Sequence, residues 1–225
     1  MHAAGTAGTG CWRCRDAAAT GELVCPRCEV VQPLPAGVDL FRVLGLPRRL
    51  AVEAADLERR YHAASRVVHP DRHQTAGERE RELSLSASAA VNRAYRTLAD
   101  PVARGRYWLE LAGRRLGERG PQVPAAIAAE VFETQETLEA LRAAAPGSTA
   151  DALRGEVRKR HDDLAARLAG LRDELIGRYD AWTEADEVGL DELARRLAEI
   201  AYLRTLLGDL EEAMGDGLRG THHRH

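Results

Sequence analysis

ASRVVHPDRHQTAG, at residues 64–77, ends one predicted helix and opens the loop that leads to the next. The first helix begins near Val52, and its apolar residues recur at intervals that place them on one face. Pro70 disfavours helical backbone at the residue before it and has no N–H to donate to the helix. The helix therefore ends by His69, and His69-Pro70-Asp71 is predicted to form a rigid corner.

A second helix is predicted after the corner, from about Glu78 to Asp100-Pro101. Its apolar residues also follow helical spacing, so the two helices are expected to form an antiparallel pair. Ahead of them, Asp39 is predicted to cap a short helix that Gly45 and Pro47 end. The middle of the chain is therefore predicted to be a helical hairpin with a short helix before it.

The composition of the whole chain favours an all-α protein. Its 225 residues are rich in Ala, Leu, Arg and Glu, which are strong helix formers, and 44% of them are hydrophobic. The formal charge of −3 argues against a nucleic-acid binder, and no apolar run approaches the roughly 18 residues of a membrane span. The first ten residues lack the pattern of a targeting peptide, and Lys159 is the single lysine beside many arginines, a bias typical of GC-rich bacterial genomes. We therefore expect a cytoplasmic bacterial protein that binds neither nucleic acid nor membrane.

All four cysteines lie in the first 28 residues, as Cys11-x2-Cys14 and Cys25-x2-Cys28. Each pair can present two thiolates from a tight turn, and the ten residues between the pairs allow four sulfurs to surround one ion. Zinc suits soft thiolates, and a segment of about 37 residues has too little apolar surface to fold unaided. The sequence therefore predicts a structural zinc site, with redox dithiols or a cysteine-ligated iron–sulfur cluster as alternatives.

Few basic residues accompany the cysteines, since three arginines are offset by two acids between Cys11 and Cys28. So few basic residues offer little attraction for the phosphates of a nucleic acid. A structural or protein-docking role is therefore favoured over nucleic-acid binding. Pro33-x-Pro35-Ala-Gly37 then breaks the chain and marks the end of this segment.

The corner and its flanks resemble the J-domain, the module by which co-chaperones stimulate ATP hydrolysis in DnaK-type chaperones. His69-Pro70-Asp71 matches its signature tripeptide, and DLFRVLGL (39–46) and VNRAYRTLADP (91–101) match the flanking sequence. The resemblance implies that hydrolysis belongs to the partner, so this chain is predicted not to be an enzyme.

An ionised Asp71 can accept charge-assisted hydrogen bonds, and a basic strip on the preceding helix would guide an acidic partner. The predicted chaperone-binding residues are His69, Pro70, Asp71, Arg59, Arg60 and Arg66. The simpler alternatives are a capped turn and a solvated helix face.

PVARGRYWLELAG (101–113) resembles the Pro-x-x-Arg-x-x-Tyr-x-Leu junction of HscB, the co-chaperone family dedicated to iron–sulfur cluster assembly, some members of which carry a tetracysteine segment. Downstream, the sequence predicts a helix after Pro124, a long helix after 146–148 and a final helix to Met214. Their heptad-like apolar spacing predicts an antiparallel three-helix bundle. The predicted domains are a zinc-binding segment at 1–37, a J-domain at 38–112, a scaffold-binding bundle at 113–215 and a disordered tail at 216–225.

The HscB resemblance implies that the bundle docks an IscU-type cluster scaffold through its first and last helices. The matching positions in this sequence are Ala128, Ala129, Phe132, Glu133, Glu136, Ala140 and Tyr202. The family usually has bulkier apolar residues at the first two positions and often an acid at the sixth, so weaker scaffold binding or a different partner surface is expected. Phe132 and Tyr202 would be aromatic anchors, and the alternative is that both belong to the core.

These features together favour a co-chaperone that delivers a scaffold protein to a DnaK/HscA-type ATPase. A general J-protein for unfolded clients is the first alternative, and a zinc-ribbon nucleic-acid factor is a second one that the charge balance disfavours. The sequence leaves open which chaperone paralogue is the partner, what the zinc segment contacts and whether the chain forms a homodimer.

Overall fold

The computed structural model describes residues 10–16, 22–114, 125–183 and 186–219, and the side chains of 125–127 and 216–219 are not part of that description. The regular structure in these residues is helical, apart from one isolated antiparallel bridge between Val24 and Val31. This confirms the predicted all-α class. The chain divides into two compact units, residues 1–107 and 108–225.

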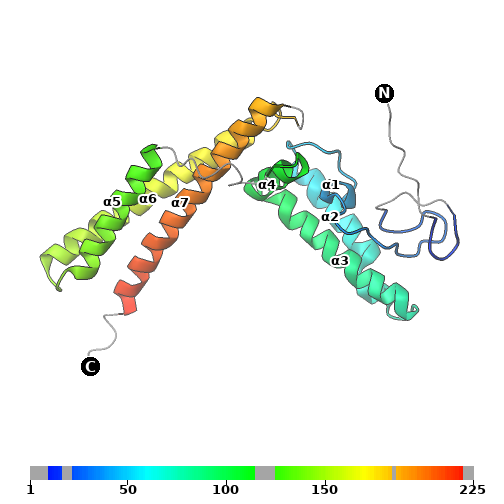
Figure 1. The fold of residues 1–225 in the computed structure, drawn as a ribbon. Helices are drawn as coiled ribbons and strands as arrows, with labels where there is room; N and C mark the ends of the chain where they lie inside the picture. Colours follow the sequence, from blue (N-terminus) through cyan, green and yellow to red (C-terminus); the bar gives the residue numbers. More distant parts are fainter. Residues whose placement is uncertain (1–9, 17–21, 115–124, 184–185, 220–225) are drawn as a thin grey trace. The chain divides into compact units, whose positions relative to one another are not determined.

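The first unit contains the predicted helical hairpin (Figure 1). Its helices are α1 (Leu40–Val43), α2 (Ala54–Val68), the 3-10 turn η1 (Pro70–His73) and α3 (Glu78–Ala99). α2 ends at Val68 and η1 begins at Pro70, as the position of Pro70 predicts. α1 and α2 both pack against α3, and the shared core consists of Leu40, Phe41, Val43, Leu57, Val68, Ala87, Val91, Ala94 and Leu98.

The junction after α3 is held by contacts of Arg104 and Tyr107. Helix α4 (Pro101–Leu111) begins directly after Asp100, and Arg104 is buried with its Nη1 donating to the carbonyl of Leu98 at 2.6 Å. The Tyr107 hydroxyl accepts from the backbone N–H of Leu40 at 2.9 Å and donates to Asp39 at 3.2 Å. Burial raises the pKa of Tyr107 above its usual value. The junction thus fixes α4 to the start of α1, where Asp39 is the predicted N-cap.

The second unit contains a three-helix bundle of α5 (Ala125–Ala143), α6 (Ser148–Gly177) and α7 (Glu187–Arg219). Short connections make consecutive helices antiparallel, as predicted (Figure 1). α7 continues to Arg219, four residues into the predicted tail, and residues 220–225 lie outside the described part. The bundle core consists of Leu138, Val157, Leu164, Leu203, Leu206, Leu207 and Leu210.

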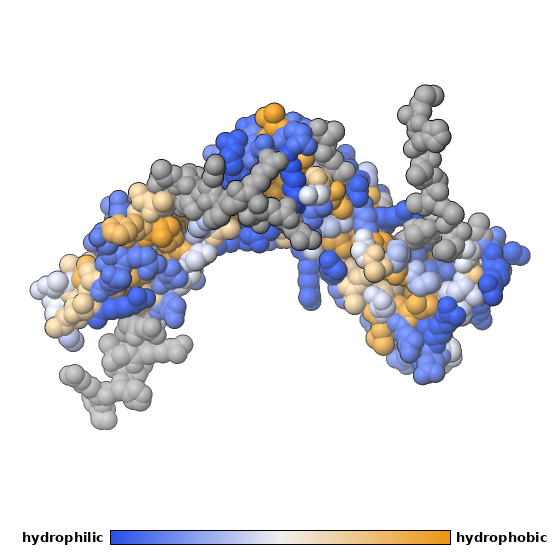
Figure 2. Space-filling model, in the orientation of Figure 1, coloured by the Kyte–Doolittle hydropathy of each residue, from blue (hydrophilic) through white to orange (hydrophobic). Residues whose placement is uncertain are grey.

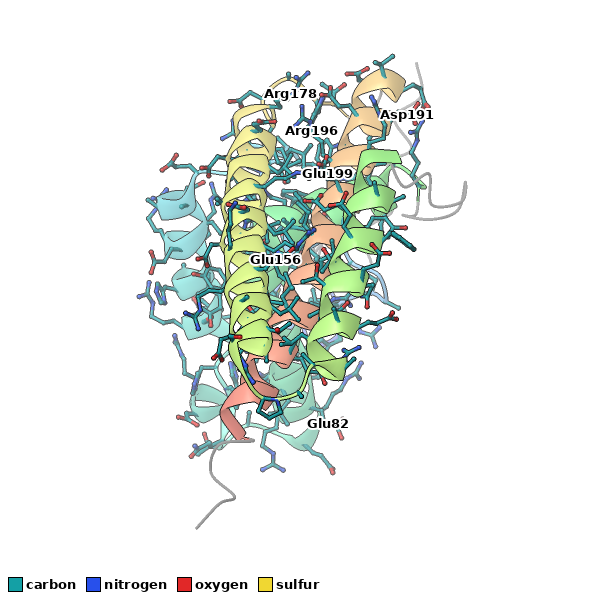
Figure 3. The ribbon with its side chains drawn as sticks, turned by 90° about the vertical axis from the view of Figure 1, so that its left-hand side faces the viewer. Glu82, Glu156, Arg178, Asp191, Arg196 and Glu199 are labelled. Atoms are coloured by element: carbon teal, nitrogen blue, oxygen red, sulfur yellow. The ribbon has the colours of Figure 1, made fainter. Side chains whose placement is uncertain are left out.

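Ion pairs on the bundle surface fix the register of its helices. Arg167 of α6 bridges Glu130 of α5 at 2.5 Å and Glu199 of α7 at 2.6 Å. One turn before Glu199 on α7, Arg196 pairs with Glu174 of α6 at 2.8 Å, and Figure 3 shows Arg196 and Glu199 along the same helix. Arg167 and Arg196 are only partly exposed, so these pairs are less screened by solvent than fully exposed ones.

Hydrophilic residues cover most of the surface visible in Figure 2, with smaller hydrophobic patches between them. Within the described residues, none of the helices combines the length and the apolar character that a membrane span needs.

Candidate functional site

The corner between α2 and α3 presents two polar side chains to solvent. The His69 side chain is 56% exposed and that of Asp71 is 73% exposed. His69 Nδ1 accepts a hydrogen bond from the backbone N–H of Asp71 at 3.3 Å, and Gln74 donates to Asp71 Oδ1 at 3.2 Å. These two hydrogen bonds within the corner orient the side chains of His69 and Asp71, and their remaining donors and acceptors are open to a partner.

The corner is held from behind by side chains that satisfy the last carbonyls of α2. A helix leaves its final carbonyl groups without intrahelical donors. Here the carbonyl of Val68 accepts from both Ser84 at 2.8 Å and Ser88 at 2.9 Å, two serines of α3. The carbonyl of Val67 bonds the ring of His73 at 3.1 Å. The end of α2 is thereby tied to α3, which restricts how the corner can move.

The predicted basic strip on α2 is partly engaged within the molecule. Arg59 and Arg60 both pair with Asp56, and Arg60 lies 3.0 Å from one of its carboxylate oxygens. Arg60 also donates to the carbonyl of Gly45, so it ties α2 to the turn after α1. Arg66 is exposed, and its guanidinium forms no ion pair with the described residues. Arg66 and Arg59 are therefore more accessible to a partner than Arg60, and the role of all three stays a prediction.

The four cysteine sulfurs lie close enough together to surround one ion, as the spacing predicts. All four are within 4.8 Å of one another, with Cys11 to Cys28 at 3.6 Å and Cys14 to Cys25 at 3.7 Å. A tetrahedron with Zn–S bonds of about 2.3 Å has sulfur–sulfur edges of about 3.8 Å. The two cross-knuckle distances match that edge, so the site fits a single tetrahedral ion.

The two Cys-x-x-Cys turns are built alike. In the first, Cys11 N–H donates to Asp16 and Arg15 N–H donates to Cys11; in the second, Cys25 N–H donates to Val30 and Glu29 N–H donates to Cys25. Arg15 and Glu29, each directly after its second cysteine, adopt left-handed backbone with φ of 64° and 56°. That conformation is unfavourable for residues other than glycine, so the turns need a compensating interaction, which a shared ion would supply.

The electrostatics of the sulfur cluster also favour a cation. Burial raises the pKa of Cys11, but N–H groups of Cys14 and Arg13 directed at its sulfur outweigh this and lower that pKa to about 6. The Val30 N–H lowers the pKa of Cys28, yet burial and the neighbouring thiols raise it overall to about 12. The crowded sulfurs therefore do not all ionise together unless a positive charge lies between them.

The predicted docking face forms one exposed stripe along α5. Phe132 is 64% exposed and therefore does not belong to the core. The other α5 positions of the stripe are exposed as well, namely Ala128, Ala129, Glu133, Glu136 and Ala140. Glu133 also pairs with Arg160 at 3.3 Å. On α7, Tyr202 is partly buried one turn after Glu199, which the Arg167 bridge links to α5.

Two groups of site residues are not predicted by the sequence patterns. Ser84 and Ser88 read as ordinary helix positions, although their four-residue spacing places them on one face. Gln32 is buried and donates to Cys11 Sγ at 3.3 Å and to the Val30 carbonyl at 2.9 Å. A polar residue four places after a cysteine pair is a weak signal by itself, because its role depends on how the chain folds back.

Comparison with known proteins places the chain in a family. No protein-family model matches it. The chain is 33% identical over 177 residues to a co-chaperone protein HscB homolog of Aromatoleum aromaticum, covering 78% of this chain and 95% of that protein. It is 30% identical over 131 residues, 58% of this chain and 51% of the relative, to an iron–sulfur cluster co-chaperone protein HscB homolog of Arabidopsis thaliana.

The fold agrees with these sequence matches. The crystal structure of the human co-chaperone protein HscB aligns with a TM-score of 0.68 and 25% identity, covering 90% of this chain and 96% of that one. The chain is thus a J-domain co-chaperone by class, and its relatives are named as co-chaperones rather than as enzymes. It belongs to the HscB family of co-chaperones of iron–sulfur cluster assembly.

Proposed function

We propose that this protein stimulates ATP hydrolysis by a DnaK/HscA-type chaperone and delivers an IscU-type iron–sulfur scaffold to it. The observation that carries the proposal is the exposed His69-Pro70-Asp71 corner, whose backbone is fixed by bonds from α3 to the end of α2. A fixed corner lets both polar side chains meet a partner without first losing loop entropy. Arg59 and Arg66 add a positive field beside it that serves encounter with an acidic surface.

The bundle supplies the second half of the proposed function. The α5 stripe combines one large exposed aromatic, Phe132, with small alanines and two acids. An exposed aromatic surrounded by small residues is a typical anchor for a protein partner. Scaffold bound there and chaperone bound at the corner would be joined through a single chain, which raises the effective concentration of one for the other.

The cysteine site is proposed to hold one structural zinc ion. Its sulfurs close around the volume of one tetrahedral ion, while a cluster of several irons with bridging sulfides needs more space. The four thiolates supply all ligands, so no position is left open for catalysis. The protein is further proposed to work in the reducing cytoplasm, where thiols remain available for a metal.

A pull-down from native cytosol, followed by mass spectrometry, tests the proposed partners. We expect an iron–sulfur scaffold protein and an ATPase chaperone among the captured proteins, with chaperone capture lost in Asp71→Asn and scaffold capture retained. A collection of unfolded or unrelated client proteins without scaffold would contradict the proposal and favour a general J-protein.

Replacing Phe132 by Ala is expected to weaken scaffold binding by about thirtyfold, since truncating an anchor aromatic typically costs about 2 kcal/mol. The melting temperature should change by only a few degrees, because the side chain is 64% exposed. Calorimetric titration with purified scaffold and a thermal melt measure both effects. Val188→Ala removes another exposed apolar side chain, 77% exposed on α7, and should leave binding unchanged. Unchanged affinity in Phe132→Ala would remove α5 from the docking face.

Tyr202→Ala is expected to lower both scaffold affinity and thermal stability, because Tyr202 is only partly exposed. We expect a loss of scaffold affinity together with a loss of stability larger than that of Phe132→Ala. A stability loss of about 3 kcal/mol or more with intact binding would assign Tyr202 to the core alone. The same titration and melt distinguish the two results.

A further inference from the structure

The first metal knuckle, Cys11–Cys14, contacts the start of α3 through both residues between its cysteines. The guanidinium of Arg79 lies over the Trp12 ring, 4.6 Å from its centroid. Next to it, Arg13 Nη1 lies 3.6 Å from Glu80 Oε2. Because Trp12 and Arg13 are part of the Cys-x-x-Cys turn, both contacts depend on the turn that a bound metal would hold in shape.

Glu80 connects this contact to the corner. Its other carboxylate oxygen, Oε1, lies 3.3 Å from Nδ1 of His73, the last residue of η1. The side chains of Glu80 and His73 are only 14% and 12% exposed, so their interaction is less screened than a surface pair. The other ring nitrogen of His73 bonds the carbonyl of Val67, in the last turn of α2. A continuous set of contacts therefore runs from the knuckle to the end of α2.

We propose that the metal-bound first knuckle positions the His69-Pro70-Asp71 corner through Arg13, Glu80 and His73, with Trp12 on Arg79 as a parallel tie. Metal loss would release Arg13 and Trp12 from α3 and let Glu80, His73 and the corner sample other arrangements. The apparent affinity for the chaperone then falls in proportion to the fraction of competent corner. The inference rests on the proposed function, because it requires a metal at the cysteines and a chaperone at the corner.

Hydrogen exchange of residues 66–77 tests the coupling directly in the full-length protein, loaded with zinc or stripped by a chelator. Opening should become about three- to tenfold faster in the stripped wild type, as expected from losing one ion pair and one cation–π contact. The double variant Arg13→Ala/Arg79→Ala, called the tie variant, removes both contacts between the first knuckle and α3 and keeps the cysteines. In this variant the segment should exchange fast even with zinc bound, and stripping should add less than about twofold.

A matched control removes two other exposed arginines of α3, in Arg81→Ala/Arg93→Ala. It should respond to stripping as the wild type does. If stripping exposes residues 10–16 but leaves exchange in 66–77 unchanged, or if the tie variant responds like the control, the coupling does not exist. Metal content and circular dichroism are measured on every sample, so a failure to bind zinc or to fold is recognised as a different result.

The second readout is chaperone ATP hydrolysis as a function of co-chaperone concentration. The tie variant should raise the half-maximal concentration by the same three- to tenfold factor, with the maximal rate unchanged. A lower maximal rate at unchanged half-maximal concentration would contradict a positioning role. If the zinc-loaded wild type does not stimulate the chaperone at all, the proposed function fails, whereas the exchange experiment still decides the coupling.

Discussion

Asp71→Asn is expected to reduce stimulation of the chaperone's ATP hydrolysis at least tenfold at a sub-saturating co-chaperone concentration. The substitution keeps the shape of the side chain and removes its charge, and a hydrogen bond to a charged group is worth about 1.5–3 kcal/mol. His69→Gln should have a similar effect, because the ring nitrogen that accepts from the Asp71 N–H orients both residues. Single-turnover hydrolysis with saturating chaperone measures the rate.

One observation and one control variant make this result specific to the corner. Both side chains are more than half exposed, so the melting temperature and scaffold binding of the variants should match the wild type. Asp173→Asn makes the same chemical change at an exposed position of α6 and should leave stimulation unchanged. Full stimulation by both corner variants would contradict the J-domain assignment of the site.

Cys25→Ser is expected to abolish stable metal binding, from one zinc per chain in the wild type to almost none after dialysis. Structural zinc with cysteine ligands contributes an apparent 10–16 kcal/mol or so to such segments, and serine is a poor substitute for a fully buried thiolate. The turns with left-handed Arg15 and Glu29 should then lose their structure. Metal analysis together with hydrogen exchange of residues 10–16 and 22–32 measures both losses.

The helical parts should keep their thermal transition in Cys25→Ser, since the cores of the hairpin and the bundle contain none of the cysteines. Arg27 lies in the same Cys-x-x-Cys turn, and its exposed guanidinium pairs with Asp16 at 3.4 Å, so Arg27→Ala should still bind a full equivalent of zinc. Detection of a coloured iron–sulfur centre in the wild type, or of four freely titratable thiols without metal, would show that the predicted chemistry is wrong.

The elements that the sequence predicts well are the ones with local signals. Pro70 and Asp100-Pro101 limit the two hairpin helices by steric rules that act within one or two residues, and the structure has α2 and α3 end at these points. Asp39 caps α1 through its own side chain. The four cysteines meet as expected because their spacing already restricts how two turns can face each other.

Contacts between distant parts of the chain are not predictable in the same way. The Pro33 to Gly37 break suggests a segment separated from the hairpin, yet Trp12 and Arg13 contact residues at the start of α3. In the sequence, Arg13, Arg79 and Glu80 look like ordinary solvated charged residues, and only the fold brings them into contact. Likewise, Ser84 gains its role from the position of the Val68 carbonyl across the hairpin.

The most direct test of the central claim is chaperone ATP hydrolysis measured with this protein and the scaffold, alone and together. A chain that joins both partners is predicted to give stimulation well above the sum of the separate effects, because bound scaffold is presented at high effective concentration. Phe132→Ala should lose the excess and keep the stimulation without scaffold, while Asp71→Asn should lose both. Purely additive stimulation in the wild type would contradict delivery of the scaffold by this protein.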